Sequence, residues 1–330
     1  MTQKILFITS TRIGDAILST GVLAYILEKH PKALVTVACG PLVESLFEGF
    51  PQLETIIPLR KKSWNRHWIQ LWSKIIGTKW DIVVDLRNSA VSRLIRADKC
   101  FIYGPHIDRS QHKVIQNAAV IQASPSLARP TLFLTPAQMN KARLLIPDGP
   151  PVLGVGPTAN WIGKIWPVDK FIELIKTLTE DGEAFAGWRI AVFGAPGEEF
   201  IATELFESLP EETRINCIAK GNPGEAAACI SRCQFYIGND SGLMHSAAAA
   251  GIKTLGLFGP TNDALYAPYG NLTTFIRTPE SLDQLIGGPD FQIKNVTESL
   301  MKNLSVETVV NKIKNFIKET GKSSASDMVA

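Results

Sequence analysis

Apolar runs alternate with amphipathic segments through the first half of the chain. The runs at 4–9, 34–38, 82–86 and 100–103 are continuous, as in strands covered on both faces. Segment 16–29 instead repeats its apolar residues at helical spacing. This alternation predicts a parallel sheet with helices on both of its faces.

The same alternation restarts after a cluster of breaker residues. Residues 147–151 read Pro-Asp-Gly-Pro-Pro, which neither a helix nor a central strand accommodates. Beyond this cluster the pattern predicts strands at 152–156, 188–193, 235–238 and 254–258, and helices at 167–180, 224–232, 242–250 and 306–318.

The chain is therefore predicted to be an α/β protein of two Rossmann-like, doubly wound domains. We place the N-terminal domain at 1–150 and the C-terminal domain at 151–320, with a closing helix that either stays there or packs back on the N-terminal domain. The Ser-rich residues 321–330 are predicted to be a disordered tail. Ligands of such sheets bind at the carboxyl ends of the strands, so the loops that follow the strands are the place to look for chemistry.

Composition agrees with this picture and narrows the class of protein. The 330 residues are 45% apolar and 20% charged, which suits two domains with cores of their own. No apolar run approaches the roughly 18–20 residues of a membrane span, and we expect a cytoplasmic protein without a transmembrane segment. Five scattered cysteines argue against a disulfide framework, and Cys229 and Cys233 are predicted to be core thiols rather than metal ligands.

Charge is divided unevenly between the two halves. Residues 1–150 carry 19 Lys and Arg against 10 Asp and Glu, a net charge of +9, and the remainder carries 15 against 21, a net charge of −6. A basic first half suggests an anionic partner. Nucleic acid is not the partner we expect, because no nucleic-acid-binding module is recognisable.

Three stretches carry candidate chemistry, and the first follows the first predicted strand. Residues 10–15 contain Gly14 but lack the remaining glycines of the dinucleotide-binding fingerprint. Asp15 supplies a carboxylate at the mouth of the sheet. It is either a helix cap or a general base, and the two roles are compatible.

The second stretch, residues 156–167, follows the first predicted strand of the second half. Lys164 there adds a full positive charge near a helix N-terminus, which suits a pyrophosphate; a solvated loop lysine is the alternative. Trp161 and Trp166 favour an ordered loop. After the next strand, Glu198 suits the two hydroxyls of a ribose, or else is a solvated acid at a helix start.

The third stretch, residues 237–251, reads as strand, tight turn and short helix. The backbone N–H groups of Ser241 and Gly242 suit a phosphate, and Asp240 either binds hydroxyls or holds the turn. His245 lies one turn into the helix with its side chain leaning back toward the N-terminus, although a core histidine is the alternative.

Five short motifs in order resemble glycosyltransferase family 9, the ADP-heptose:lipopolysaccharide heptosyltransferases, over about residues 4 to 318. They are Ile13-Gly14-Asp15, Lys164-x-Trp166-Pro167, Gly194-Ala195-Pro196-x-Glu198, Asn239-Asp240-Ser241-Gly242-x-x-His245 and Phe258-Gly259-Pro260-Thr261. The resemblance implies a GT-B fold, with the acceptor on the N-terminal domain and an ADP-sugar on the C-terminal one. It also implies a lipopolysaccharide-core acceptor at the inner-membrane surface.

Residue roles follow from the same resemblance. Asp15 is implied to be the catalytic base and Lys164 the cation at the diphosphate. The implied donor contacts are Thr158, Ser241, Gly242 and His245 at the phosphates, Asp240 at the sugar or the turn, and Glu198 at the ribose. No cofactor is expected, and no metal, because the chain lacks an Asp-x-Asp pair.

Two departures limit this transfer. The loop between Thr158 and Lys164 is longer than in well-known members, which weakens the role given to Thr158. Residues 221–223, where the family contacts the adenine, are not distinctive, so the identity of the base rests on the family alone.

A basic segment follows in the N-terminal half. Arg60 and Lys61, with Lys62 and Arg66, are candidates for binding the anionic acceptor. Trp64, Trp68 and Trp72 recur every four residues, which suits a helix packed on the sheet or one touching a membrane. Two other functions stay open, a nucleotide-sugar epimerase and a non-catalytic binding protein that keeps the fold.

Overall fold

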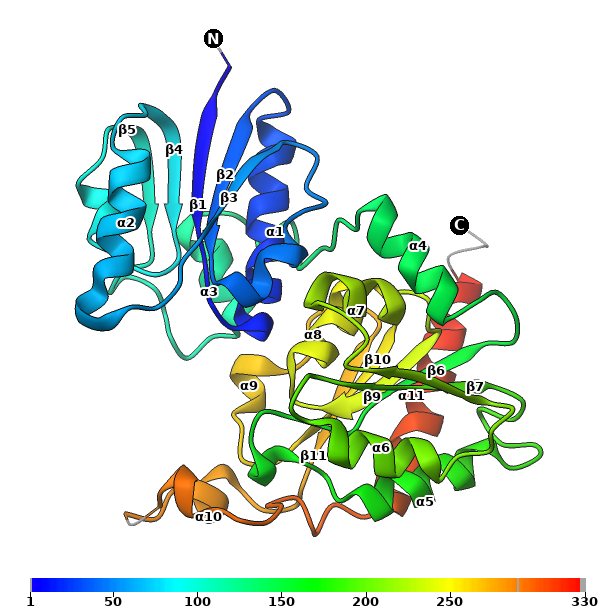
Figure 1. Ribbon diagram of the computed structural model, residues 1–330. Helices are drawn as coiled ribbons and strands as arrows, with labels where there is room; N and C mark the ends of the chain where they lie inside the picture. The colour runs from blue at the N-terminus through cyan, green and yellow to red at the C-terminus, as the bar shows by residue number, and fades with distance from the viewer. Residues whose placement is uncertain (1, 290, 327–330) are drawn as a thin grey trace. The chain divides into compact units, whose positions relative to one another are not determined.

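The computed structural model describes residues 2–289 and 291–326, with 322–326 described by their backbone alone (Figure 1). The chain forms two compact units. The first contains the residues up to Asn140 together with Gly221–Ala228, and the second contains the rest.

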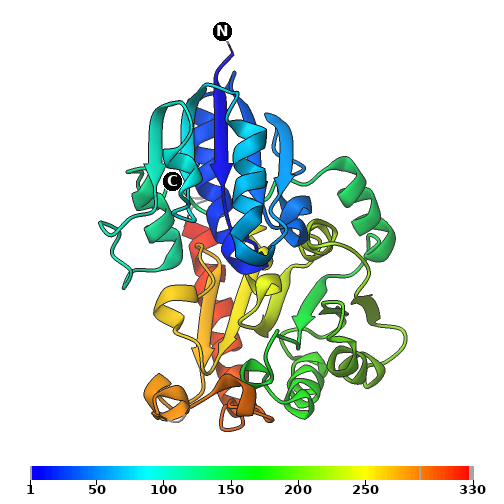
Figure 2. The same ribbon diagram turned by 60° about the vertical axis from the view of Figure 1, so that its left-hand side comes forward.

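The first unit is built on five parallel strands with β1 in the middle. Their order is β3 (Leu53–Pro58), β2 (Leu34–Cys39), β1 (Lys4–Ile8), β4 (Trp80–Asp85) and β5 (Ala97–Ile102). Helices α1 (Ile13–Lys29) and α3 (Lys113–Val120) pack against each other, and α2 (Arg66–Ile75) covers the sheet from the other side (Figure 2). Short 3₁₀ turns lie at Pro41–Leu46, Ser63–Asn65 and Val91–Arg93.

The second unit repeats the design with six parallel strands. Their order is β11 (Thr273–Arg277), β10 (Lys253–Phe258), β9 (Phe235–Asn239), β6 (Val152–Gly156), β7 (Arg189–Gly194) and β8 (Arg214–Ile218). Its helices are α5 (Val168–Thr179), α6 (Glu199–Glu207), α8 (Gly242–Ala249), α9 (Asp263–Tyr266), α10 (Leu282–Ile286) and α11 (Val306–Ser326), with 3₁₀ turns at Ile162–Lys164 and Ile293–Asn295. Helices α4 (Pro136–Leu145) and α7 (Pro223–Ile230) each have residues in both units.

This architecture confirms the predicted α/β fold with two doubly wound parallel sheets. The strands that the sequence did not predict are β3, β8 and β11, and each lies at the edge of its sheet. An edge strand is covered on fewer sides, so its apolar residues are interrupted by polar ones and give a weak pattern. No helix among the described residues is both long and apolar enough to cross a membrane.

The C-terminal helix differs from what the sequence predicted. Helix α11 continues to Ser326 and so includes the first part of the predicted disordered tail, while 327–330 lie outside the described residues. Its buried side chains, among them Ile313 and Phe316, belong to the core of the second unit, and Phe316 packs edge-on against Phe235 of β9. The helix therefore packs on the second unit.

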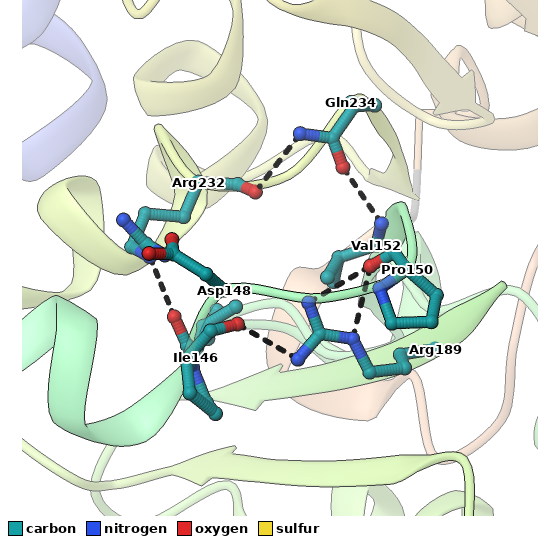
Figure 3. A network of polar contacts seen from close by, with 8 residues as sticks. Ile146, Asp148, Pro150, Val152, Arg189, Arg232 and Gln234 are labelled. Carbon is teal, nitrogen blue, oxygen red and sulfur yellow. Dashed lines mark hydrogen bonds and ion pairs between the residues drawn. The ribbon is translucent and has the colours of Figure 1, made fainter.

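Two arginines hold the breaker cluster to the second unit (Figure 3). The guanidinium group of Arg189 donates to the carbonyl oxygens of Pro147 and Pro150 at 2.8–3.0 Å. Arg232 donates to the carbonyl oxygen of Ile146 and pairs with the carboxylate of Asp148. These bonds make the cluster part of the second unit, and the division between the units falls earlier, at Asn140–Lys141 within α4, rather than at residue 150.

Each sheet has a point where the order of strands reverses. In the first unit it lies between β1 and β4, and in the second between β6 and β9. Such a switch point is the usual ligand site of a doubly wound sheet, because the loops on its two sides diverge and leave room between them.

A tyrosine ring fixes the local packing at the second switch point. Tyr236 on β9 is fully buried. Gly156 and Gly238 are paired in register, and a Cβ atom added to them would lie 1.9 Å and 2.7 Å from the Tyr236 hydroxyl oxygen. Both positions therefore require glycine for the ring to fit.

We predict that Gly156→Ala lowers the free energy of unfolding by about 1–3 kcal/mol, because the new methyl group overlaps the phenol. Adding Tyr236→Phe should recover part of this loss, since it removes the nearest atom. Gly77→Ala is the control, because an added Cβ there meets no atom within 4 Å. Denaturant unfolding measures all four proteins, and a Gly156→Ala variant as stable as the control would contradict the packing argument.

Candidate active site

A buried amide joins the two loops beside the switch point of the second sheet. The side chain of Asn239, at the end of β9, accepts a hydrogen bond from the backbone N–H of Trp166 at 3.1 Å and donates to the carbonyl oxygen of Pro157 at 2.8 Å. Asn239 is fully buried. It therefore fixes both ends of the loop that follows β6.

Lys164, within that loop, forms an ion pair with the turn after β9. Its Nζ atom lies 2.8 Å from Oδ2 of Asp240, whose side chain is only 7% exposed, whereas that of Lys164 is 23% exposed. The same Nζ approaches the carbonyl oxygen of Asp240 at 3.4 Å. Lys164 is thus held in place, and it is not the freely solvated lysine that the sequence left open.

Asp240 also has an imidazole near its second oxygen. Nε2 of His245 lies 3.9 Å from Oδ1 of Asp240, and the histidine is buried in the first turns of α8. The burial fits the core-histidine alternative, and the position beside Asp240 keeps the ring at the same edge of the sheet. Asp240 therefore lies between a lysine and a histidine.

Two buried hydroxyl groups at the same edge of the sheet have no hydrogen-bond partner among the described residues. They belong to Thr158, which follows β6, and to Ser241, the residue before α8. Ser241 makes no capping bond to its own helix. An unpaired buried hydroxyl is uncommon and costs about 1–3 kcal/mol, so two of them at the edge of the sheet that also carries a helix N-terminus and Lys164 favour an anion as the missing partner.

The Tyr236 phenol and the Trp161 indole add two further buried donors without a partner in the described chain. Burial raises the pKa of Tyr236, so its hydroxyl stays protonated and keeps its donor proton. Ser241 lies next to this phenol. Neither donor was predicted from the sequence. The only signal for the phenol is the position of two glycines, Gly156 and Gly238, on neighbouring strands.

Glu198 lies beyond the end of β7, the strand next to β6. It is partly exposed, and its side chain makes no capping bond to α6, which begins at the next residue. The carboxylate is therefore available at the same edge of the sheet as Thr158.

In the first unit, Asp15 occupies the first turn of α1 and is partly buried. Its carboxylate has no hydrogen bond or ion pair with any residue that the structure describes. Arg12 is the N-cap residue of α1, and its backbone N–H donates to the hydroxyl oxygen of Ser10 at 3.1 Å. Asp15 therefore does not cap the helix, and both of its oxygens are available to accept a proton.

Basic side chains gather at the same edge of the first sheet. Arg60 and Lys61 are exposed after β3, and Arg87 is exposed after β4, the strand next to β1. The pKa of His67 is lowered by burial and by the charges of Arg87 and Lys61, which places both cations near one imidazole. Arg87 was not predicted, and its only signal in the sequence is that it follows β4, a strand adjacent to β1.

Cys229 and Cys233 agree with their prediction as core thiols. Both are buried, and none of the five cysteines forms a disulfide bond. Within the described ranges, no group of three or more His, Cys, Asp and Glu side chains is arranged to hold a metal ion.

The unpaired hydroxyls lead to a stability test. Thr158→Val should keep or raise the free energy of unfolding, by up to about 1–3 kcal/mol, because it removes a buried hydroxyl that has no partner. The matched control is Thr254→Val, since the equally buried Thr254 donates to the carbonyl oxygen of Ile252 at 3.0 Å. This control should lose about 0.5–1.5 kcal/mol. Equal losses in the two variants, measured by denaturant unfolding, would mean that Thr158 has a partner after all.

Comparison with known proteins gives this geometry a family. The model of glycosyltransferase family 9 (heptosyltransferase) matches residues 102–285. Lipooligosaccharide heptosyltransferase 2 of Haemophilus influenzae is 25% identical over 315 residues, which cover 84% of this chain and 89% of the relative.

Solved structures are similar to this structure over almost the whole chain. The glycosyl transferase family 9 protein from Veillonella parvula has a TM-score of 0.76 at 20% identity and covers 96% of this chain and 97% of its own. E. coli ADP-heptose LPS heptosyltransferase II has a TM-score of 0.72 at 19% identity and covers 97% and 100%. The fold is thus the two-domain GT-B fold, and with a family model matching more than half of its residues, this chain belongs to glycosyltransferase family 9 and is a glycosyltransferase.

Proposed function

We propose that this protein is an inverting heptosyltransferase, which moves a heptose from an ADP-activated donor to an anionic acceptor of the lipopolysaccharide inner core. The observation that carries the proposal is at the carboxyl edge of the second sheet, where the Lys164–Asp240 pair and the buried, unpaired hydroxyls of Thr158 and Ser241 all follow β6 or β9. The names of the relatives, which transfer heptose to lipooligosaccharide or use ADP-heptose, support the choice of sugar, nucleotide and acceptor.

The donor diphosphate would occupy this anion site. Several groups there can donate hydrogen bonds to the anion. They are the hydroxyls of Thr158 and Ser241, the ammonium group of Lys164 and the first backbone N–H groups of α8, which begins at Gly242. When the bond between the anomeric carbon and the diphosphate oxygen breaks, its electron pair leaves with ADP. Donors that are already in place stabilise this developing charge without reorganising, which lowers the barrier.

Asp240 would act mainly by positioning. Its carboxylate already holds Lys164 and lies close to His245, so it aims the ammonium group and keeps the turn after β9 in shape. The ammonium group has three protons and can bind the diphosphate while it keeps its bond to Asp240. Glu198, which follows β7, would hold the ribose hydroxyls.

In the first unit, Asp15 would be the general base. Its unpaired carboxylate accepts the proton of an acceptor hydroxyl as that oxygen attacks the anomeric carbon from the side opposite the diphosphate. A single displacement through an oxocarbenium-like transition state inverts the configuration at that carbon. Arg60 and Lys61, exposed at the same edge of the sheet, would bind the anionic groups of the acceptor.

We predict that Asp15→Asn lowers the rate of transfer by about 10²–10⁴-fold or more, because the amide cannot take the proton. Its affinity for ADP should change by less than about twofold, as the residue belongs to the other unit. Coupled ADP-release kinetics and calorimetric ADP binding measure the two quantities. A parallel loss of ADP affinity would assign Asp15 a structural role.

Lys164→Ala should weaken ADP binding and slow transfer together, each by about tenfold or more, because a charge-assisted contact of roughly 1.5–3 kcal/mol is lost. Lys176→Ala is the control, since Lys176 is exposed on α5. Thr158→Val should also weaken ADP binding, although it does not lower the stability. Unchanged ADP affinity in Lys164→Ala would remove the lysine from the donor site.

Product analysis separates this function from its rivals. With ADP-heptose alone, a nucleotide-sugar epimerase converts the donor, whereas the transferase leaves it intact until an inner-core acceptor is added. A non-catalytic binding protein produces neither change. Proton NMR of the product then gives the anomeric configuration, and a retained configuration would contradict the direct displacement by the acceptor.

A further inference from the structure

Helix α2 is apolar on two sides, and only one of them packs on the sheet. Leu71 and Ile75 are buried against the core of the first unit, and Trp68 is partly buried there. On the side that faces solvent, Ile69 is 64% exposed and Trp72 is 38% exposed. A helix that only had to cover its sheet would carry polar residues at these outer positions.

Neighbouring segments extend the exposed apolar surface. Ile76 follows at the end of α2, and Leu94 lies beside Trp72, whose indole N–H donates to the Leu94 carbonyl oxygen at 3.2 Å. Trp64 precedes the helix and is 92% exposed. We call Trp64, Ile69, Trp72, Ile76 and Leu94 the α2 stripe.

The backbone before α2 holds Trp64 away from the protein. Trp64 and Asn65 both have left-handed backbone angles, with φ of 57° and 55°. This conformation is costly for a bulky side chain such as tryptophan, so it persists only where the surrounding structure imposes it. Here it presents the largest apolar side chain to the solvent, next to the rest of the stripe.

The concentration of such residues is local. Of the twelve large apolar side chains that are exposed in the described part of the chain, five belong to the α2 stripe. The others, such as Phe200 on α6, lie scattered over both units. Single exposed apolar residues are ordinary on protein surfaces, whereas a group on one helix marks an interaction surface.

The charges around the stripe indicate what covers it. Between Leu59 and Trp80 the sequence contains six Lys and Arg and no Asp or Glu. Among them Lys62, Arg66 and Lys74 are exposed and have no ion pair in the described structure. Another of the six, Lys79, is paired with Asp98 of β5.

We propose that the α2 stripe docks on an anionic lipid bilayer, with its tryptophans at the depth of the headgroups and the flanking lysines and arginines on the lipid phosphates. A helix with apolar and aromatic residues on one side and basic residues beside them is the form that lies in a membrane interface. This docking rests on the proposed function, because a lipid-linked acceptor would then be presented at the edge of the sheet that carries Arg60 and Lys61.

The test uses the full chain and vesicles of phosphatidylcholine with or without phosphatidylglycerol, in a sedimentation assay. The unchanged protein should bind the anionic vesicles, and more weakly as salt is raised, because counterions screen the charges. The double variant Trp64→Ser/Ile69→Gln should bind them at least about tenfold more weakly. Lys74→Gln should give a smaller loss of the same kind.

The control is Phe200→Ser, which removes a side chain that is 84% exposed in the second unit. It should bind vesicles as the unchanged protein does. All variants should melt at the same temperature, since the altered side chains are mostly exposed. Equal vesicle binding by the double variant, or no binding of anionic vesicles by the unchanged protein, would overturn the proposal; in the latter case the stripe is left to a protein partner.

Transfer to an acceptor stripped of its acyl chains separates this proposal from the catalytic one. The double variant should keep the rate of the unchanged protein on that acceptor and lose rate only on an acceptor embedded in vesicles. A protein that binds vesicles through the stripe yet transfers no sugar to either acceptor would refute the proposed function and leave the docking surface intact.

Discussion

The ion pair between Lys164 and Asp240 joins a loop after β6 to a turn after β9, on the two sides of a reversal in strand order. A carboxylate that is almost fully buried needs a compensating charge, because its desolvation is otherwise too costly. The lysine supplies that charge and in return is held at one place. Ser241, the N-terminus of α8 and the imidazole of His245 lie about this pair, and Thr158 lies at the same edge of the sheet, so the geometry of the pair shapes the proposed anion site.

The buried centre of each sheet could be predicted because burial leaves a dense pattern. Strands β1, β2, β6 and β9 have continuous apolar runs, and the predicted ranges match them within a residue or two. The edge strands β3, β8 and β11 could not be predicted in the same way, since exposure on one side mixes polar residues into them. The division of the chain also falls earlier than the breaker cluster suggests, because residues 146–150 are held to the second unit by Arg189 and Arg232, which are far away in the sequence.

The sequence predicts at which edge of a sheet each candidate residue lies, but not which hydrogen bonds and ion pairs these residues form. A loop that follows a strand of a parallel sheet lies at its carboxyl edge. This rule places Asp15, Thr158, Glu198 and Ser241 at the carboxyl edges of their sheets, where the structure has them. It does not say that Lys164 pairs with a residue 76 positions away, or that Asn239 binds two backbone groups of another loop. Such contacts depend on register and side-chain direction, which single-sequence patterns do not contain.

The two hydrogen bonds of Asn239 have a consequence for the affinity of a ligand. These bonds fix Pro157 and Trp166, so the residues between them form a closed loop with both ends anchored during folding. Closing and ordering a loop costs conformational entropy, and here that cost falls on folding rather than on binding. A ligand that arrives at Lys164 therefore meets a loop that is already ordered, and its affinity is not reduced by the need to organise one.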